Sequence, residues 1–251
     1  MEELFKLALL FFSGAIAGFI NIMAGGGSTI TLPLLIFFGL DGALANGTNR
    51  IAVFVQNIAA IISFKQEKFA QFKLSFKLSI CTLPGAIIGA IVAVKIGNEL
   101  FQKILGIVII GIMITILFPQ LNRRSKSQAN DDSFNPWLLY PAMFGIGFYG
   151  GFIQAGVGFL IMAALLHLMN LDLVRVNMHK VFIVFVFTLP AILIFIFTDN
   201  VEWSYALILS AGNALGGWWS AKISVKKGER VIRVVLLIAM LIMALKLLRV
   251  F

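Results

Sequence analysis

The sequence predicts an all-α polytopic membrane protein made of two inverted-topology repeats, each with about five helical segments. The first observation behind this prediction is composition: 60% of the 251 residues are apolar and only 12% are charged, about half the charged share of a typical soluble domain. The second is that the apolar residues form runs of membrane-spanning length. The third is an internal duplication. The composition argues against a soluble enzyme, a disordered chain and a disulfide scaffold.

Apolar runs mark most of the expected segments in chain order. A helix that crosses a bilayer needs about 20 apolar residues. The runs are Leu4–Ile22, Ile51–Phe64, Leu74–Val94, Ile104–Phe118, Val181–Phe197, Tyr205–Ala221 and Val231–Leu248. The N-terminus is acidic and lacks the basic region of a secretory signal, so we expect the first run to remain in the membrane.

Each repeat is expected to open with a long apolar run, a glycine-rich break and a short helix. In the first half the run Leu4–Met23 meets Ala24-Gly25-Gly26-Gly27-Ser28, and the short run Thr29–Leu40 follows. As a helix this short run is about 18 Å long, too short for a normal span. The second half has the same order, with Trp137–Gln154 before the break and Phe159–Leu171 after it. Broken backbone is tolerated in hydrocarbon only inside protein or beside water.

The duplication appears when one half is slid along the other. At an offset of 131 residues (145 − 14), Gly14 pairs with Gly145. Further along, the offset falls to 127, and Gly85 pairs with Gly212. A polar stretch separates the halves. We therefore expect one integral membrane domain, with a first transmembrane repeat over 1–119, a linker over 120–136 and a second repeat over 137–251.

The charges of corresponding loops swap between the halves, which favours inverted repeats. Loop Lys65–Lys77 is rich in lysine, whereas its counterpart Thr198–Ser204 carries acids and no base. Five segments per half would put the N-terminus outside and the linker 120–136 in the cytoplasm, with most basic residues inside. Four segments per half would instead give parallel repeats with basic loops on both sides. The net charge of +9 then reflects cytoplasmic loops, and no nucleic-acid partner is expected.

The glycine break is the first candidate for binding chemistry. It presents backbone N–H groups at the start of a short helix, which Ser28 or Thr29 can cap. A helix N-terminus carries a partial positive charge and favours an anion. The groups concerned are Gly26, Gly27, Ser28 and Thr29, with Gly156 and Gly158 as their second-half counterparts. The alternative is a glycine-lined helix crossing.

The second candidate is the polar stretch before Ile51. It contains Asn46, Thr48, Asn49 and Arg50. A charge at membrane depth is costly unless it is paired, and the stretch has no nearby acid except Asp41. An anionic substrate can supply the missing partner. The alternative is an interfacial arginine that extends to lipid headgroups.

The third candidate is the matching stretch of the second half, with Asn177, His179 and Lys180. Together Arg50 and Lys180 would make a positively charged cavity at the repeat interface. His179 titrates near neutral pH, which makes a proton a candidate coupled ion. The alternative for Lys180 is a positive-inside loop residue.

Three amides inside apolar runs complete the candidate site: Gln56, Asn57 and Gln154. Gln56 and Asn57 follow Arg50 by about two helical turns, so one of them can share its face. Such amides often form hydrogen bonds between membrane helices, which is their alternative role.

Motifs of catalysis and metal binding are absent from the sequence. It has no HExxH, no Cys–His cluster, no Walker loop and no Gly-x-Ser-x-Gly. We therefore expect no enzyme activity, no catalytic residues, no cofactor and no metal.

The segment SGAIAGFINIMAGGGSTITLPLLIFFGL, followed by ANGTNRIAVFVQN, resembles the opening of the sulfite exporter TauE/SafE family of membrane transporters. GFYGGFIQAGVGFLIMAALLHLMNLDL resembles its second repeat. The resemblance implies a cytoplasmic-membrane permease that exports sulfite or a small organosulfonate such as sulfoacetate. Gly25–Ser28 and Gly47–Thr48 match the glycine-rich and Gly-Thr segments of the family, whereas Met178-His179 replaces Gly-Thr in the second repeat.

The expected function is secondary transport of a small anion by alternating access between the repeats. The partners are the anion, the lipid bilayer and a candidate coupled proton. One alternative is an anion channel or a carrier of another small organic anion. The other is a membrane scaffold that transports nothing.

Overall fold

The protein is an all-α polytopic membrane protein, as the composition predicts. The computed structural model describes residues 2–117, 136–169, 171–232 and 234–235, and within these ranges every regular element is a helix. The first half contains α1 (Glu2–Met23), α2 (Ser28–Phe37), α3 (Gly42–Gln66), α4 (Phe72–Lys95) and α5 (Asn98–Leu117). The second half contains α6 (Pro136–Phe152), α7 (Val157–Met169), α8 (Leu173–Phe197) and α9 (Trp203–Lys227). Of these, α1, α4 and α8 are long and apolar enough to cross a membrane. The expected linker over 120–136 and most of the last run lie outside the described residues.

Helices α3 and α8 begin earlier than their apolar runs suggest. Each follows an extended aspartate, Asp41 or Asp172, and Asp172 accepts hydrogen bonds from two N–H groups in the first turn of α8. The polar stretches 46–50 and 177–180, which precede the apolar runs, therefore lie inside helices and are buried. Apolar periodicity misses these first turns because their polar side chains face the protein interior rather than lipid.

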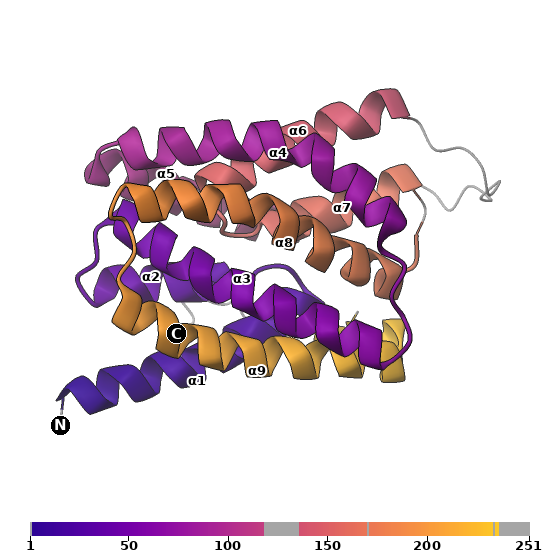
Figure 1. The fold of residues 1–251 in the computed structure, drawn as a ribbon, viewed down its shortest axis with the longest axis horizontal. Coiled ribbons are helices and arrows are strands. Elements are labelled where there is room, and N and C mark those ends of the chain that lie inside the picture. The colour runs from indigo at the N-terminus through magenta and orange to yellow at the C-terminus, as the bar shows by residue number, and fades with distance from the viewer. Residues whose placement is uncertain (1, 118–135, 170, 233, 236–251) are drawn as a thin grey trace.

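Helices α1, α9, α3, α8, α4 and α6 lie side by side in this order and form a row (Figure 1). The contacts run from α1 to α9, α9 to α3, α3 to α8, α8 to α4 and α4 to α6. Helix α9 of the second half thus packs between α1 and α3 of the first half, and α4 packs between α6 and α8 in the same way. The two halves are interleaved, so each completes the packing of the other.

The centre of the row is the contact between α3 and α8. The rings of Phe54 and Phe185 stack there, with their centroids 5.1 Å apart. The two helices are antiparallel: Thr48, near the start of α3, contacts the α8–α9 loop, whereas Met178, near the start of α8, contacts the α3–α4 loop. A residue pair separated by 131 positions (185 − 54) therefore meets at the centre of the molecule.

Glycines let the outer helices approach each other closely. Gly14 and Gly18 of α1 lie against the backbone of α9, and Gly147 and Gly151 of α6 lie against the backbone of α4. The sequence comparison paired Gly14 with Gly145, but a Cβ at Gly145 would have open space around it. Gly147 has the close contact instead, because the helix face that meets α4 is displaced by two residues from the simple offset.

The two glycine breaks meet each other. Gly25 and Gly156 both have a positive φ, +90° and +72°, which favours glycine because it has no Cβ. The backbone of Gly25 also lies against the backbone of Gly158, with no room for a side chain at either residue. The breaks expected from the sequence are therefore present, and the short helices α2 and α7 start from their crossing.

Candidate substrate site

Lys180 of α8 lies at the broken end of α1. Its Nζ donates to the carbonyls of Asn21 and Ile22 at 3.1 and 2.6 Å, and to the side chain of Asn177 at 2.9 Å. The Sδ of Met162 is 3.5 Å away. The carbonyls of Asn21 and Ile22 are among the last of α1 and have no partner within the helix. A cation of the second half thus caps a broken helix of the first half.

Arg50 of α3 has the reciprocal role at the broken end of α6. Its Nη1 donates to the Gly150 carbonyl at 2.9 Å, and its Nη2 donates to Gly151 and, at 3.4 Å, to Phe152. The guanidinium lies over the Phe195 ring, 4.8 Å from its centroid. The side chain is fully buried. The partner of Arg50 is therefore the C-terminal end of a helix, whose partial negative charge attracts a cation.

The positive charges of both residues have only neutral partners. None of the ion pairs in the described part of the chain involves Arg50 or Lys180. A helix C-terminus carries roughly half an elementary charge, so each end offsets only part of the adjacent cation. The interior between the halves is therefore electropositive.

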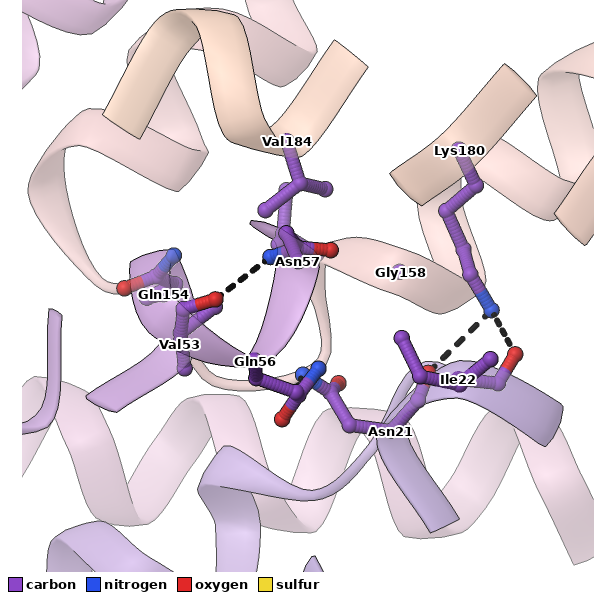
Figure 2. Close-up of a pocket in the computed structure, with 10 residues that line it drawn as sticks. Asn21, Ile22, Val53, Gln56, Asn57, Gln154, Gly158, Lys180 and Val184 are labelled. Carbon is purple, nitrogen blue, oxygen red and sulfur yellow. Dashed lines mark hydrogen bonds between the residues drawn. The ribbon is translucent and has the colours of Figure 1, made fainter. Parts of the chain in front are cut away.

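Lys180 also lines a small cavity between the halves (Figure 2). The other polar lining residues are Asn21, Gln56, Asn57 and Gln154, and Gly158 of the second break lies beside them. The cavity has a volume of about 10 Å³, which is room for about one water molecule. Arg50 does not line it.

The amides of the cavity are only partly hydrogen-bonded. Asn21 donates to Gln56 Oε1 at 3.3 Å, and Gln154 donates to Thr188 at 3.1 Å. Gln56 Nε2 and Gln154 Oε1 are buried with no protein partner, a costly condition unless water or a ligand satisfies them. Asn57 donates to the Val53 carbonyl at 2.7 Å.

The hydroxyls of the first break bond to protein groups rather than cap α2. The N-cap of α2 is Gly27, which has no side chain, so neither Ser28 nor Thr29 caps the helix as the sequence suggested. Ser28 accepts from Asn49 at 3.1 Å, and Thr29 donates to the Gly26 carbonyl at 2.6 Å. The N–H of Gly27 donates to the Asn21 side chain at 3.3 Å.

Asn46, Asn49 and Asn177 support the ends of the broken helices. Asn46 donates to the Phe152 carbonyl at 2.8 Å, beside Arg50. Asn49 accepts from Thr31 at 2.6 Å. Asn177 accepts from Lys180. Asn46 and Asn177 thus lie beside the capped helix ends, whereas Asn49 bonds to α2, and none of the three lines the cavity.

Thr48 and His179 lie near the starts of the antiparallel helices α3 and α8, and therefore at opposite ends of the molecule along the helix axes. Thr48 Oγ1 accepts from the N–H of Glu202 at 2.9 Å, and His179 Nδ1 is 2.7 Å from Ser75 Oγ. Each residue joins the start of its helix to a segment of the other half. Neither residue lines the cavity beside Lys180 and Gln56, although the sequence predicts all four in one site.

Asn21 and the helix ends contribute to the site but are not among the features predicted from the sequence. Asn21 donates to Gln56 and accepts from Gly27, so it connects the break to the cavity. An amide four residues before a glycine run was the available signal. Backbone carbonyls some 100 residues away give no sequence signal at all. Within the described ranges, no group of three or more His, Cys, Asp and Glu residues could bind a metal.

Comparisons with known proteins match the chain to one family model and to several membrane transporter proteins. The family model described as "Sulfite exporter TauE/SafE" matches residues 10–247. A "Probable membrane transporter protein" of Haemophilus influenzae is 28% identical over 241 residues, covering 96% of this chain and 93% of its own. The "Probable membrane transporter protein YfcA" of Escherichia coli is 28% identical over 246 residues, with 96% and 89% coverage. No solved structure matches the chain significantly.

Proposed function

The chain belongs to the sulfite exporter TauE/SafE family, a family of multi-pass membrane transporters, and from that premise we propose that it is a secondary transporter that exports a small sulfur oxyanion, sulfite or an organosulfonate. The anion binds at the cavity beside Lys180, between the two halves. Transport proceeds by alternating access.

One observation carries this proposal: a buried cation lines a polar cavity that both halves build. Lys180 has neutral partners only. A charged residue at membrane depth is expected to have a functional role, because burying its charge is costly. An oxyanion supplies the missing negative charge. Gln56 Nε2, which has no protein partner, can donate to a second oxygen of the same anion.

Arg50 acts on the site through α6 rather than through the anion. It bonds to the last carbonyls of α6, and Gln154 lies two residues beyond the end of that helix. In this proposal Arg50 and Asn46 fix the second break, so that Gln154 and Gly158 stay beside the cavity.

The size of the cavity supports movement of the halves during transport. A space for about one water molecule is too small for sulfite. Access therefore requires the halves to separate first at one end of the molecule along the helix axes and then at the other end. Hydrogen bonds between the halves occur at both ends, Thr48 with Glu202 and Gln71 with Met178, as expected for a closed intermediate.

Several pairs of matching features support inverted repeats. Helices α3 and α8 each have 25 residues and are antiparallel. The loops that follow them contain the positive-φ residues Lys68 and Asp199, with φ of 56° and 54°. The offset of 131 (199 − 68) is the one found in the sequence. In this proposal the lysine-rich end is cytoplasmic in the inner membrane and the N-terminus is outside.

Counterflow of labelled sulfite into proteoliposomes tests the function directly. The purified chain in sulfite-loaded vesicles should accumulate external labelled sulfite, and the uptake should saturate. Lys180→Met, which keeps the length of the side chain and removes its charge, should abolish uptake. Lys65→Met, the same change at an exposed position on α3, should leave it unchanged.

Three results would contradict the proposal. Normal uptake by Lys180→Met would remove the cation from the mechanism. A conductance without saturable counterflow would indicate an anion channel. Absence of any flux for sulfite, sulfoacetate and related anions would favour a scaffold.

A further inference from the structure

A second polar cavity lies where the α3–α4 loop meets the start of α8. Its volume is about 420 Å³. Its lining includes Lys73 and Lys77 of α4, Arg175 of α8 and the buried His179, and none of the described residues that line it is acidic. We propose that this cavity, the basic vestibule, binds an oxyanion group of the phosphate, sulfate or sulfonate type.

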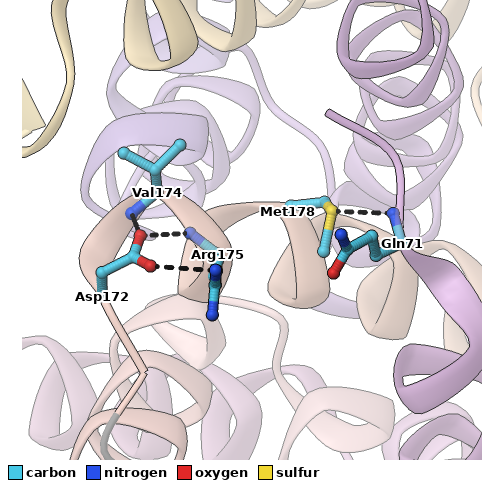
Figure 3. A network of polar contacts seen from close by, with 5 residues as sticks. All are labelled: Gln71, Asp172, Val174, Arg175 and Met178. Atoms are coloured by element: carbon cyan, nitrogen blue, oxygen red, sulfur yellow. Dashed lines mark hydrogen bonds and ion pairs between the residues drawn. The ribbon is translucent and has the colours of Figure 1, made fainter. Parts of the chain in front are cut away.

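The cations of the vestibule are available to a ligand. Asp172 accepts from two N–H groups at the start of α8 and pairs with Arg175 Nε at 3.2 Å (Figure 3). This contact orients the guanidinium and leaves its two Nη groups without a partner in the described part of the chain. Lys73 and Lys77 are exposed, and the described residues offer neither Nζ an ion pair or hydrogen bond.

The geometry favours an oxyanion with several oxygens. Lys73 and Lys77 are four residues apart, so they lie on the same face of α4. Arg175 approaches from α8 with a planar fork of donors that matches oxyanions well. The vestibule thus offers charge-assisted hydrogen bonds from two helices, which a group with oxygens in several directions can accept together.

The inner wall of the vestibule is formed by a buried side chain that contacts a neighbouring helix. His179 is only 4% exposed, and its Nδ1 is 2.7 Å from Ser75 Oγ, which joins α8 to α4. Lys180 follows His179 and lines the inner cavity, so the two cavities flank one turn of α8. A role for the vestibule as the mouth of the transport route rests on the proposed function, whereas oxyanion binding does not.

Thermal unfolding of the purified chain in inorganic phosphate and in sulfate, at constant ionic strength, tests the binding. Wild type should be stabilised by both anions. The variant Lys73→Gln/Lys77→Gln/Arg175→Gln should lose most of this shift, because one charge-assisted hydrogen bond is worth about tenfold in Kd.

A matched control removes the same charges from the same end of the molecule. Lys65→Gln/Lys227→Gln/Arg230→Gln changes two exposed lysines and one exposed arginine that do not line the cavity. It should keep the wild-type shift. An equal loss in both triple variants, or no shift in wild type in either detergent or lipid, would overturn the proposal.

Lipid vesicles separate the two sources of this chemistry, a free anion and an anionic lipid headgroup. In vesicles of phosphatidylcholine the free anions should still stabilise wild type. If phosphatidylglycerol removes that effect and itself protects wild type but not the vestibule variant, the ligand is a headgroup. Lys180→Met should keep the phosphate shift while it loses sulfite counterflow, so failure of transport and failure of the vestibule are distinguishable.

Discussion

Buried cations at the ends of broken helices are the main feature at the scale of single residues. Arg50 and Lys180 each donate to carbonyls that a helix end leaves without partners. Each does so across the halves, so the same contacts stabilise both the break and the interface. The residues next to them in the sequence have other roles: Asn49 bonds to the short helix α2, and His179 faces the vestibule.

Loss of the Arg50 side chain should destabilise the protein strongly. Arg50→Ala leaves the buried carbonyls of Gly150 and Gly151 without their donor, and each unsatisfied group costs about 1–3 kcal/mol. We expect a loss of about 3 kcal/mol or more, measured as a lower midpoint of unfolding in detergent. Arg50→Lys should lose less, because it keeps one cationic donor.

An exposed arginine provides the control for this prediction. Arg230→Ala should change stability by about 0.5 kcal/mol at most. If Arg50→Ala unfolds no earlier than Arg230→Ala, the carbonyls of α6 have found other partners and the capping role is wrong.

These residues show how far the sequence could predict the site. Amides and cations in apolar runs identified Arg50, Lys180, Gln56 and Gln154 as candidates, because such residues stand out by composition. The division of labour among them was not predictable. It depends on carbonyls of α6 and α1 that are near Arg50 and Lys180 only after the halves interleave.

At the scale of helices, close glycine contacts set the packing of the outer pairs. Gly14 and Gly18 on α1 oppose Gly212 and Gly216 on α9, where each helix lies against the backbone of the other. The contact of α4 with α6 has the same pattern of glycines on both helices. Small residues spaced by four allow such approach in membranes, where packing rather than hydrophobic burial drives association.

Two glycines of α6 that are two residues apart give a matched test of this packing. Gly147→Leu places a side chain against the Thr82 backbone of α4, whereas Gly145→Leu places it in open space. Overpacking costs about 1–3 kcal/mol, so Gly147→Leu should unfold at a lower temperature than wild type. Gly145→Leu should match wild type or exceed it, since leucine is the better helix former. Equal effects of the two substitutions would show that α4 and α6 are not in close contact.

Helix existence was predictable from hydropathy, and helix limits were not. The short helices α2 and α7 were expected from the glycine breaks, since glycines of this density end a helix. The apolar runs do not reveal the starts of α3 and α8, because Asn46–Arg50 and Asn177–Lys180 are polar yet buried. Polar residues at a membrane edge and polar residues in an interhelical core give the same sequence pattern.

At the scale of the whole molecule, the two ends along the helix axes differ in charge. The α3–α4 loop, the first turns of α8 and the last turns of α9 meet at one end, where Lys226 pairs with Glu67. The starts of α3, α5 and α9 meet at the other end, where Asn98 bonds to Asp41 and Thr48 bonds to Glu202. By the positive-inside rule, this difference in charge supports the proposed orientation with the lysine-rich end in the cytoplasm.

Thiol labelling of two matching loop positions tests this orientation. Lys68→Cys and Asp199→Cys, each in a Cys81→Ser background, place an exposed thiol at residues with nearly the same positive φ. A membrane-impermeant maleimide added to intact cells should label position 199 and should reach position 68 only after permeabilisation. Labelling in the reverse order would invert the proposed topology.

Alternating access predicts that a cross-link between the halves at either end stops transport. Two contacts between the halves lie at opposite ends of the molecule along the helix axes: Gln71 with Met178, and Thr48 with Glu202. Cysteine pairs at these positions, joined by a short thiol-specific linker in a Cys81→Ser background, should each abolish sulfite counterflow, because the halves can no longer separate at that end. Reduction of the linker should restore counterflow.

A cross-link within one half is the control that gives this test its meaning. Asp41 and Asn98 are also in contact, with a hydrogen bond of 2.9 Å, but both belong to the first half. Joining them should leave counterflow intact if that half moves as a unit. Counterflow that survives a complete cross-link at Gln71–Met178 would show that the lysine-rich end need not open there. The anion would then pass between the halves without their separation, as in a channel, and Lys180 would be part of a fixed pore rather than of a site that faces each side in turn.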